Sequence, residues 1–201
     1  MAISPADVKK LREQTGCGIM DCKQALQEAN GDFEEATDIL RKKGIAVAAK
    51  RADRAASEGA VVSYIHGDGR IGVLLELNCE TDFVARTDSF RELARELAMQ
   101  VAAAKPKWVA KGDVCEADLA RERSVLIEQA KAEGKPEHIA ERMVEGRMRK
   151  FYEEFCLLEQ EYIRDESKKV QDLIDDLVGQ CGEKVVVRRF VRYALGEELP
   201  W

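Results

Sequence analysis

The hydrophobic pattern of this chain changes its period at Gly59, from a helical repeat to an alternation of apolar and polar residues. The alternating segments are GAVVSYIH (59–66) and RIGVLLELNC (70–79), and they flank a GDG turn. Alternation with a period of two is typical of half-buried strands, and Asp-Gly between apolar runs is a strong hairpin signal. The pattern therefore predicts a β-hairpin, whose apolar face is formed by Ile71, Val73, Leu75, Leu77 and Cys79.

The residues before the hairpin carry the signals of three short helices. Ser4 and Asp32 are suited to cap the first and third helices, because their side-chain oxygens can accept hydrogen bonds from free N–H groups. Gly44 is suited to end the third helix. We expect a three-helix domain over 1–45 and a helical linker over 46–58.

The residues after the hairpin return to a helical repeat and then to a β-type segment, EKVVVRRFVRY (183–193). This last strand most simply joins the hairpin in an antiparallel sheet of about three strands, packed against helices. Its apolar residues lie on both faces, which favours a central position.

The placement of a highly charged helix over 116–133 stays open: on the sheet, projecting outward, or against a second copy. The fold class is α+β, with a core over 59–201. The expected helical stripes are Phe90, Leu93, Leu97 and Val101, then Val144, Met148, Phe151 and Phe155, then Val170, Leu173, Ile174, Leu177 and Val178.

Composition excludes several classes of protein. The net charge of −6 argues against a protein that mainly binds phosphate backbones. No apolar run reaches the ~20 residues that span a bilayer, and the first residues lack the apolar stretch of a secretory signal. The six cysteines are scattered and the two histidines are isolated, so the sequence predicts neither a disulfide framework nor a metal site. We expect reduced thiols, a cytoplasmic location, and no membrane or direct nucleic-acid partner.

Motifs of catalysis are missing from the sequence. It contains no G-x-x-x-x-G-K-[ST] phosphate loop, no G-x-S-x-G motif and no Gly-rich dinucleotide turn. With 38 Asp and Glu residues, a chosen carboxylate pair carries no information. A thiol enzyme stays open, because the spatial pairing of a Cys with a His cannot be seen in a sequence. We expect no enzyme, no catalytic residues and no cofactor.

Phe83 stands at an unusual place, in CETDFVAR (79–86), where the predicted strand gives way to a helix. One interpretation makes Phe83 a plug for a corner of its own core, with Asp82 as the N-cap of the following helix. The other presents the ring to a partner, where burial of an exposed Phe is worth about 1.5–3 kcal/mol. The pattern alone allows both.

Five segments, taken together, resemble the bacterial elongation factor Ts family. They are LREQTGCGIMDCKQAL (11–26), CETDFVA (79–85), AAAKPKWV (102–109), VEGRMRKFYEEFCLLEQ (144–160) and VVVRRFVRYALGE (185–197). They occur in the family's order and cover nearly the whole chain. The resemblance implies a nucleotide exchange factor for the GTPase elongation factor Tu, acting without covalent chemistry.

The resemblance also implies two surfaces that bind elongation factor Tu. The first is an exchange motif that reaches the GTPase near its Mg²⁺ and phosphate sites, where Phe83 enters an apolar gap; its residues are Thr81, Asp82, Phe83 and Val84. The second lies on the first domain, which the resemblance makes ubiquitin-associated-like and which docks on a helix of the GTPase domain; its residues are Ile19, Met20, Cys22 and Lys23. Ile19 and Met20 suit the core of so small a domain equally well. The α+β core is expected to contact a further domain of elongation factor Tu.

The sequence departs from the family at three points. Cys17 stands where Ala is frequent, and Glu161 stands where Pro is common. Long family members carry two related core subdomains, whereas this chain has one hairpin and one helical set. The resemblance to the short form implies a homodimer through the core domain, and Cys181 is a candidate for its interface.

The main alternative is a ubiquitin-associated-like adaptor that associates with RNA or the ribosome. Its binding would rest on Lys42, Lys43, Lys50, Arg51 and Arg54. The acidic net charge disfavours it, and such a run is more simply a solvated helix face.

Overall fold

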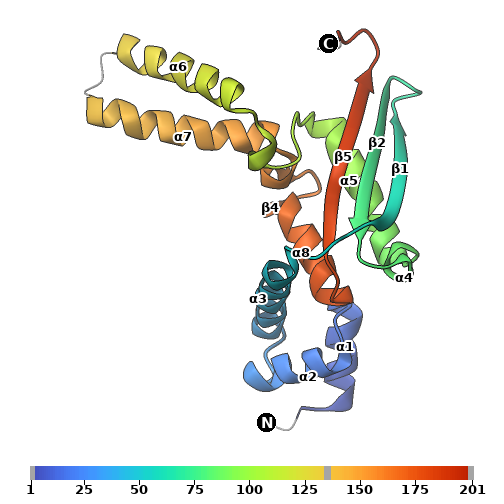
Figure 1. The fold of residues 1–201 in the computed structure, drawn as a ribbon. Helices are drawn as coiled ribbons and strands as arrows, with labels where there is room; N and C mark the ends of the chain where they lie inside the picture. Colours follow the sequence, from blue (N-terminus) through green and yellow to red (C-terminus); the bar gives the residue numbers. More distant parts are fainter. Residues whose placement is uncertain (1–2, 134–136, 199–201) are drawn as a thin grey trace. The chain divides into compact units, whose positions relative to one another are not determined.

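The computed structural model describes residues 3–133 and 137–198 and has the predicted α+β class (Figure 1). The chain divides into two compact units, each assembled from three stretches of sequence. The first unit comprises Met1–Val62, Leu75–Glu96 and Asp172–Arg188, and the second comprises Ser63–Leu74, Leu97–Gln171 and Arg189–Trp201. The strands of the sheet and the long helix after the hairpin therefore contribute residues to both units.

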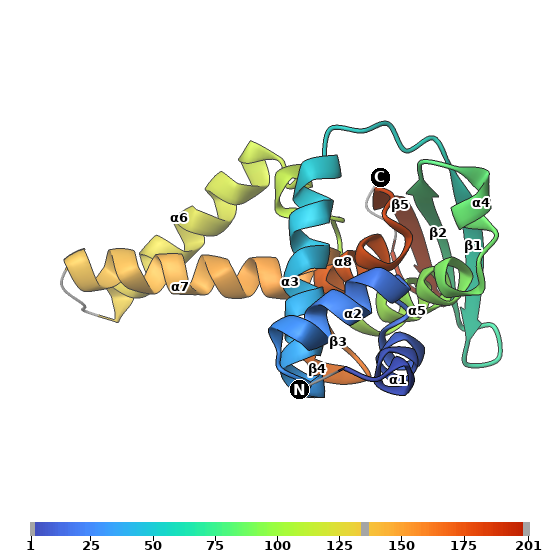
Figure 2. The same ribbon diagram turned by 90° about the horizontal axis from the view of Figure 1, so that it is seen from below.

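Three helices open the first unit: α1 (Pro5–Thr15), α2 (Ile19–Glu28) and α3 (Phe33–Arg51) (Figure 2). The side chains of Ser4 and Asp32 cap α1 and α3, as the sequence predicts. Each cap satisfies N–H groups that have no partner within the helix. The three helices share one core, formed by Val8, Leu11, Cys17, Cys22, Ala25, Leu26, Ala29, Ala36 and Leu40.

Helix α3 is longer than predicted, because Gly44 does not end it. The helix continues without a break to Arg51, through the beginning of the segment that was expected to be a separate linker. Gly44 is buried, and a Cβ at this position would lie 3.0 Å from the backbone oxygen of Asp175 in α8 (Val170–Cys181). The glycine therefore allows two helices to approach each other and does not supply a turn.

The sheet contains β1 (Glu58–His66), β2 (Ile71–Cys79) and β5 (Val185–Ala194). It is antiparallel, and its order is β1-β2-β5, so the hairpin pairs with the last strand as predicted. The expected central position of the last strand is wrong, since β2 alone has a neighbour on each side. The apolar residues on both faces of β5 mark a strand with one buried face and one exposed apolar face.

The two faces of the sheet differ sharply in exposure. On β2 the predicted apolar face is buried, with Val73, Leu75, Leu77 and Cys79 at 2% exposure or less. On the other face, Ile65 is 64% exposed and Leu74 is 49% exposed. Val191 and Tyr193 of β5 are also exposed. The second unit thus leaves an apolar patch uncovered, formed by Ile65, Leu74, Val191 and Tyr193.

Helix α5 (Asp88–Ala104) follows the hairpin after a short helix, α4 (Asp82–Ala85). Its predicted stripe is buried, with Phe90, Leu97 and Val101 at 0% exposure and Leu93 at 9%. The stripe of α8 is confirmed at Val170, Ile174, Leu177 and Val178, while Leu173 is half-buried.

The charged segment 116–133 packs against the next helix. Helices α6 (Glu116–Ala132) and α7 (Glu137–Phe155) lie side by side in both views (Figures 1 and 2). Leu126 of α6 packs with Val144 and Met148 of α7 in a small core of their own. The thin apolar stripe of α6 is therefore covered by α7 of the same chain.

A short two-stranded ribbon of β3 (Glu161–Tyr162) and β4 (Asp165–Lys169) was not predicted. Its pairing does not rest on apolar alternation but on buried side-chain amides. The Gln100 side chain, which is fully buried, donates to the carbonyl oxygen of Glu161 (3.0 Å) and accepts from the N–H of Ile163 (2.9 Å). Buried amides need such partners, so this polar contact fixes the ribbon where a pattern search finds no strand.

Replacing Gly59 by Ala is expected to destabilise the fold by about 3 kcal/mol. Gly59 has a φ of 147°, and a Cβ there would overlap the carbonyl oxygen of Leu77 and lie 2.7 Å from Cα of Asn78. Because both obstacles are backbone atoms of β2, no side-chain rotation can relieve the overlap. Urea unfolding measures the loss. Gly112→Ala is the matched control, since a Cβ there meets nothing within 4 Å; equal losses in the two variants would contradict the clash.

Candidate protein-binding site

Phe83 is exposed on the short helix that follows the central strand. Its exposed fraction is 79%, the largest among the exposed large apolar residues of the described chain. The next residue, Val84, is 9% exposed, so neighbouring side chains of one helical turn point in opposite senses. The interpretation of Phe83 as a plug of its own core is wrong, as is that of Asp82 as N-cap. Helix α4 begins at Asp82, and its N-cap is Thr81 in extended conformation.

The turn that carries Phe83 is held by the carboxylate of Glu183. One oxygen of Glu183 accepts a hydrogen bond from the backbone N–H of Thr81 (3.0 Å), and the other accepts from the Thr81 hydroxyl (2.8 Å). Hydrogen bonds to a charged acceptor are stronger than those between neutral groups. Asp82 forms an ion pair with Arg86 (2.9 Å) on the outer side of the same turn. Thr81 is therefore fixed at both its backbone and its side chain, while Phe83 stays free to contact another molecule.

Glu80 anchors the same turn to two other segments of the chain. Its carboxylate accepts hydrogen bonds from the backbone N–H of Lys184 (2.7 Å) and from the guanidinium groups of Arg51 and Arg54 (3.0 Å each). These donors, the Lys184 N–H foremost, lower the pKa of Glu80 from 4.5 to about 2. Glu80 therefore ties the end of β2 to the end of α3 and to the start of β5.

The first turn of α2 presents a second exposed apolar surface. Ile19 is 55% exposed and Met20 is 69% exposed, and Lys23 is exposed on the same helix. The interpretation of Ile19 and Met20 as core residues is therefore wrong. Cys22 differs from the other three predicted residues, because it is fully buried in the three-helix core and its thiol faces the carbonyl oxygen of Cys17 (3.7 Å). Of the four predicted residues, Ile19, Met20 and Lys23 are therefore exposed on the surface of α2, and Cys22 is not.

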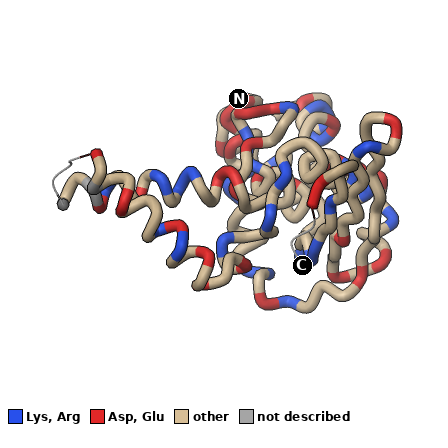
Figure 3. Tube along the Cα trace, turned by 90° about the horizontal axis from the view of Figure 1, so that it is seen from above, with Lys and Arg blue, Asp and Glu red and all other residues tan. Residues whose placement is uncertain are grey.

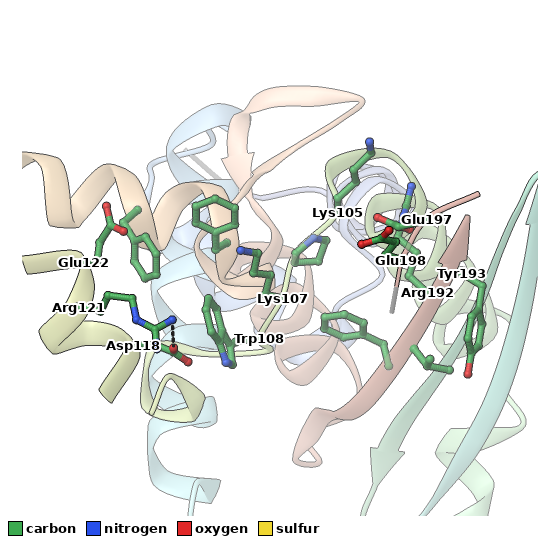
Figure 4. Close-up of a pocket in the computed structure, with 15 residues that line it drawn as sticks. Lys105, Lys107, Trp108, Asp118, Arg121, Glu122, Arg192, Tyr193, Glu197 and Glu198 are labelled. Carbon is green, nitrogen blue, oxygen red and sulfur yellow. Dashed lines mark hydrogen bonds and ion pairs between the residues drawn. The ribbon is translucent and has the colours of Figure 1, made fainter. Parts of the chain in front are cut away.

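A groove of about 950 Å³ lies in the second unit (Figure 4). Its walls are aromatic, with Trp108, Phe151, Phe155, Phe190 and Tyr193 among the lining residues. The ammonium group of Lys107 lies 4.5 Å from the centre of the Phe155 ring, a cation–π contact. Four basic and four acidic side chains also line the groove, namely Lys105, Lys107, Arg121 and Arg192, and Asp118, Glu122, Glu197 and Glu198. Because the two signs balance, the groove has no net charge that would select an anionic or a cationic ligand.

The basic residues of the adaptor hypothesis are largely paired within the chain. Lys43 forms an ion pair with Asp21, while Arg51 and Arg54 pair with Glu80. Acidic and basic residues are also interspersed along the trace (Figure 3). Paired cations release fewer counterions on binding a polyanion, which counts against an RNA-binding face here.

The thiols offer little nucleophilic character. All six cysteines lie in the described residues, where they are free and only Cys115 is exposed. Burial raises the pKa of both Cys79 and Cys156 to about 11, so both are protonated at neutral pH. Within residues 3–133 and 137–198, no group of three His, Cys, Asp or Glu side chains could hold a metal ion. No helix in these ranges is long and apolar enough to cross a membrane.

Sequence reasoning missed the residues that support the exchange motif. Glu183 and Thr81 are 102 positions apart, and Lys184 and Glu80 are 104 apart. No local pattern indicates such a pairing, because Glu183 reads as an ordinary charged residue before a strand. One signal was available in the sequence. Glu80 and Thr81 directly follow a buried strand, and polar groups at such a position require hydrogen-bond partners.

Contiguous exposed apolar patches are typical of surfaces that bind another macromolecule. The fold is that of an α+β protein, and its exposed apolar side chains on α2 and α4 form the candidate binding surfaces. Both the exchange motif and the α2 surface belong to the first compact unit.

Comparison with known proteins makes this class specific. A family model described as Elongation factor TS matches residues 6–197. The chain is 61% identical to Elongation factor Ts of Moorella thermoacetica over 195 residues, which cover 97% of this chain and 96% of that protein. It is 56% identical to Elongation factor Ts of Thermotoga neapolitana over 198 residues, covering 98% of this chain and 100% of that protein. The chain belongs to the elongation factor Ts family of translation elongation factors.

Replacing Glu80 by Gln is expected to lower the free energy of unfolding by about 2 kcal/mol at pH 7, because three donors lose a charged acceptor. The pKa of Glu80 is lower in the folded protein, about 2 against an ordinary 4.5. Its contribution is therefore complete above pH 4.5 and is lost as the pH falls toward 2. Urea unfolding of both proteins between pH 7 and pH 2 measures the difference, which should shrink with acid.

The control for this titration is Glu13→Gln. Glu13 pairs with Lys9 on an exposed helix face (3.8 Å), so this variant should match the wild type within about 0.5 kcal/mol at every pH. A difference between wild type and Glu80→Gln that stayed constant down to pH 2 would contradict the role assigned to the carboxylate.

Proposed function

We propose that this protein is a guanine nucleotide exchange factor for the GTPase elongation factor Tu. The family supports the proposal, and the observation that carries it is the exposed ring of Phe83 on a turn fixed by Glu183. The protein accelerates the release of GDP without covalent chemistry, so it is not an enzyme in the sense of bond making or breaking. It needs no metal or cofactor of its own.

The exchange motif Thr81–Val84 acts by moving groups in the partner. Phe83 enters an apolar gap in the GTPase domain close to the Mg²⁺ and phosphate sites. Packed interfaces switch between discrete arrangements, so an inserted ring shifts the groups that hold the metal. Mg²⁺ neutralises the charge of the phosphates, and its displacement weakens the binding of GDP. Linkage then requires that the factor and GDP weaken each other's binding by the same factor.

Phe83 alone is too small to account for a large exchange effect. Burial of one Phe side chain contributes about 1.5–3 kcal/mol, and each tenfold change in affinity needs about 1.4 kcal/mol. The ring therefore supplies one or two powers of ten. Further binding energy comes from Ile19, Met20 and Lys23 on α2, with the buried Cys22 supporting that turn from within the domain. The α+β core contacts a further domain of elongation factor Tu.

The proposed domain organisation assigns one role to each part of the chain. Residues 1–45 form a ubiquitin-associated-like docking domain, 46–58 connect it to the core, and 59–201 form the α+β dimerisation domain.

The uncovered apolar patch of Ile65, Leu74, Val191 and Tyr193 supports a homodimer, because a second copy would remove these side chains from water. Cys181 is half-buried next to the start of β5 and remains a candidate for this interface.

Phe83→Ala is expected to slow the release of GDP from elongation factor Tu by about 10- to 100-fold at a fixed concentration of factor. The measurement loads elongation factor Tu with fluorescent GDP and follows its release with and without the protein. Val125→Ala is the matched control, since it also truncates an exposed apolar residue, on α6. The melting temperature of each variant should equal that of the wild type. Wild-type exchange rates in Phe83→Ala would refute the role of the ring.

The protein is expected to be a homodimer at micromolar concentration, as measured by light scattering. Leu74→Lys should shift the mass toward that of the monomer, because a charged side chain at a buried interface costs several kcal/mol. Far-UV circular dichroism checks that the fold is retained, and Lys replacement of Val125, outside the patch, is the control. A wild-type protein with the mass of one chain would overturn the dimer.

A further inference from the structure

Helices α3 and α8 meet at two glycines that face each other. A Cβ added at Gly179 would lie 3.0 Å from Cα of Gly44, and one added at Gly44 would lie 3.5 Å from Cα of Gly179. Glycine inside a helix is unfavourable compared with alanine, so two such residues in contact need a reason. The reason here is the close approach of the two helix backbones, which would have to move apart slightly to admit a side chain at either position.

Polar contacts extend this junction toward the three-helix domain. Arg41 of α3 forms an ion pair with Asp172 at the start of α8 (2.8 Å). The side chain of Gln180, near the end of α8, donates a hydrogen bond to the carbonyl oxygen of Thr15 (2.9 Å). The three-helix domain is therefore attached to α8 at both ends of that helix, through α3 and through the end of α1.

The turn that follows α8 holds the exchange motif. Glu183 accepts two hydrogen bonds from Thr81, and the backbone N–H of Lys184 donates to Glu80. The ammonium group of Lys184 also donates to the carbonyl oxygens of Ala52 and Arg54, beyond the end of α3. One continuous stretch, 170–184, thus contacts the docking domain along the helix and the exchange motif at its end.

We propose that the stretch 170–184 is a spacer that holds the α2 surface at a fixed position relative to the exchange motif. The proposal rests on the exchange function, since it concerns how the two surfaces act together. When two binding surfaces are joined only by a short flexible linker, the second surface binds the partner at a millimolar effective concentration. A rigid spacer fixes the two surfaces relative to each other before binding. Binding then loses less conformational entropy, and the partner contacts both surfaces together. Glu183, Asp172 and Gln180 are positioning residues in this arrangement.

Gly179→Ala tests the spacer, with Gly146→Ala as the matched control. Both replace a helical glycine, but a Cβ at Gly146 in α7 meets nothing within 4 Å. We expect Gly179→Ala to raise the concentration of factor at half-maximal GDP release about tenfold. The maximal rate should stay within twofold of the wild type, because the exchange motif itself is intact. Gly146→Ala should change neither quantity.

A second measurement does not depend on elongation factor Tu. Amide hydrogen exchange, followed by mass spectrometry on the full chain, should be about tenfold faster over 41–51 and 172–182 in Gly179→Ala and unchanged in Gly146→Ala. Arg41→Ala removes only the ion pair and provides a milder variant if Gly179→Ala fails to fold. It should raise the half-maximal concentration about threefold, again at an unchanged maximal rate.

The outcomes separate this proposal from the exchange function. A wild-type protein that fails to accelerate GDP release defeats the exchange function and with it the joint action of the two surfaces, whatever the amides show. With active wild type, folded variants that keep both the half-maximal concentration and the amide exchange of the wild type overturn the spacer. A fall in maximal rate at unchanged half-maximal concentration also overturns it, because that result indicates damage at the exchange motif alone.

Discussion

Two carboxylates, those of Glu80 and Glu183, hold together segments of the chain that are about a hundred residues apart. Glu80 accepts hydrogen bonds from the N–H of Lys184 and from the guanidinium groups of Arg51 and Arg54. Glu183 accepts hydrogen bonds from the backbone N–H and from the hydroxyl of Thr81. Without these acceptors, the turn after β2 would keep only local contacts, chiefly the buried Val84 and Ala85 and the hydrogen bond from the Cys79 thiol to the carbonyl oxygen of Thr81. A four-residue helix cannot maintain one geometry in water, because nucleating a helix is unfavourable. The exposed position of Phe83 therefore depends on the charge-assisted hydrogen bonds that Glu80 and Glu183 accept.

Exposed apolar residues of the chain stand on several different elements of the fold. Phe83 stands on α4, Met20 on α2, and Leu74 on the uncovered face of the sheet. Each is fixed by buried neighbours on the same element, as Phe83 is by Val84 and Met20 by Cys22. Binding loses less conformational entropy when the contacting side chains stand on ordered backbone. This arrangement suits a protein whose proposed action is to change the packing of a partner.

The sequence was sufficient for the features that rest on local patterns. The hairpin, the caps at Ser4 and Asp32, and the stripe of α5 follow from periodicity and from the chemistry of helix ends. The pairing of the last strand with the hairpin was also predicted, but features that rest on close contacts between particular distant residues were not. Gly44 looks like a helix end until α8 is seen against it, and the β3–β4 ribbon depends on the buried amide of Gln100. In the candidate site, the exposure of Phe83 was one of two open readings, whereas the supporting Glu183 gave no local signal.

The unbroken course of α3 through Gly44 to Arg51 has a consequence for how this chain can vary in length. Each residue of an α-helix advances the chain by about 1.5 Å and turns it by about 100°. A single insertion or deletion after Gly44 would swing Arg51 about a quarter of the way around the helix, out of reach of Glu80, while the glycine contact stayed in place. The segment between Gly44 and Arg51 therefore fixes both the distance between the two contacts and their relative rotation about the helix axis. Relatives that lengthen it can preserve both contacts only by adding close to whole helical turns.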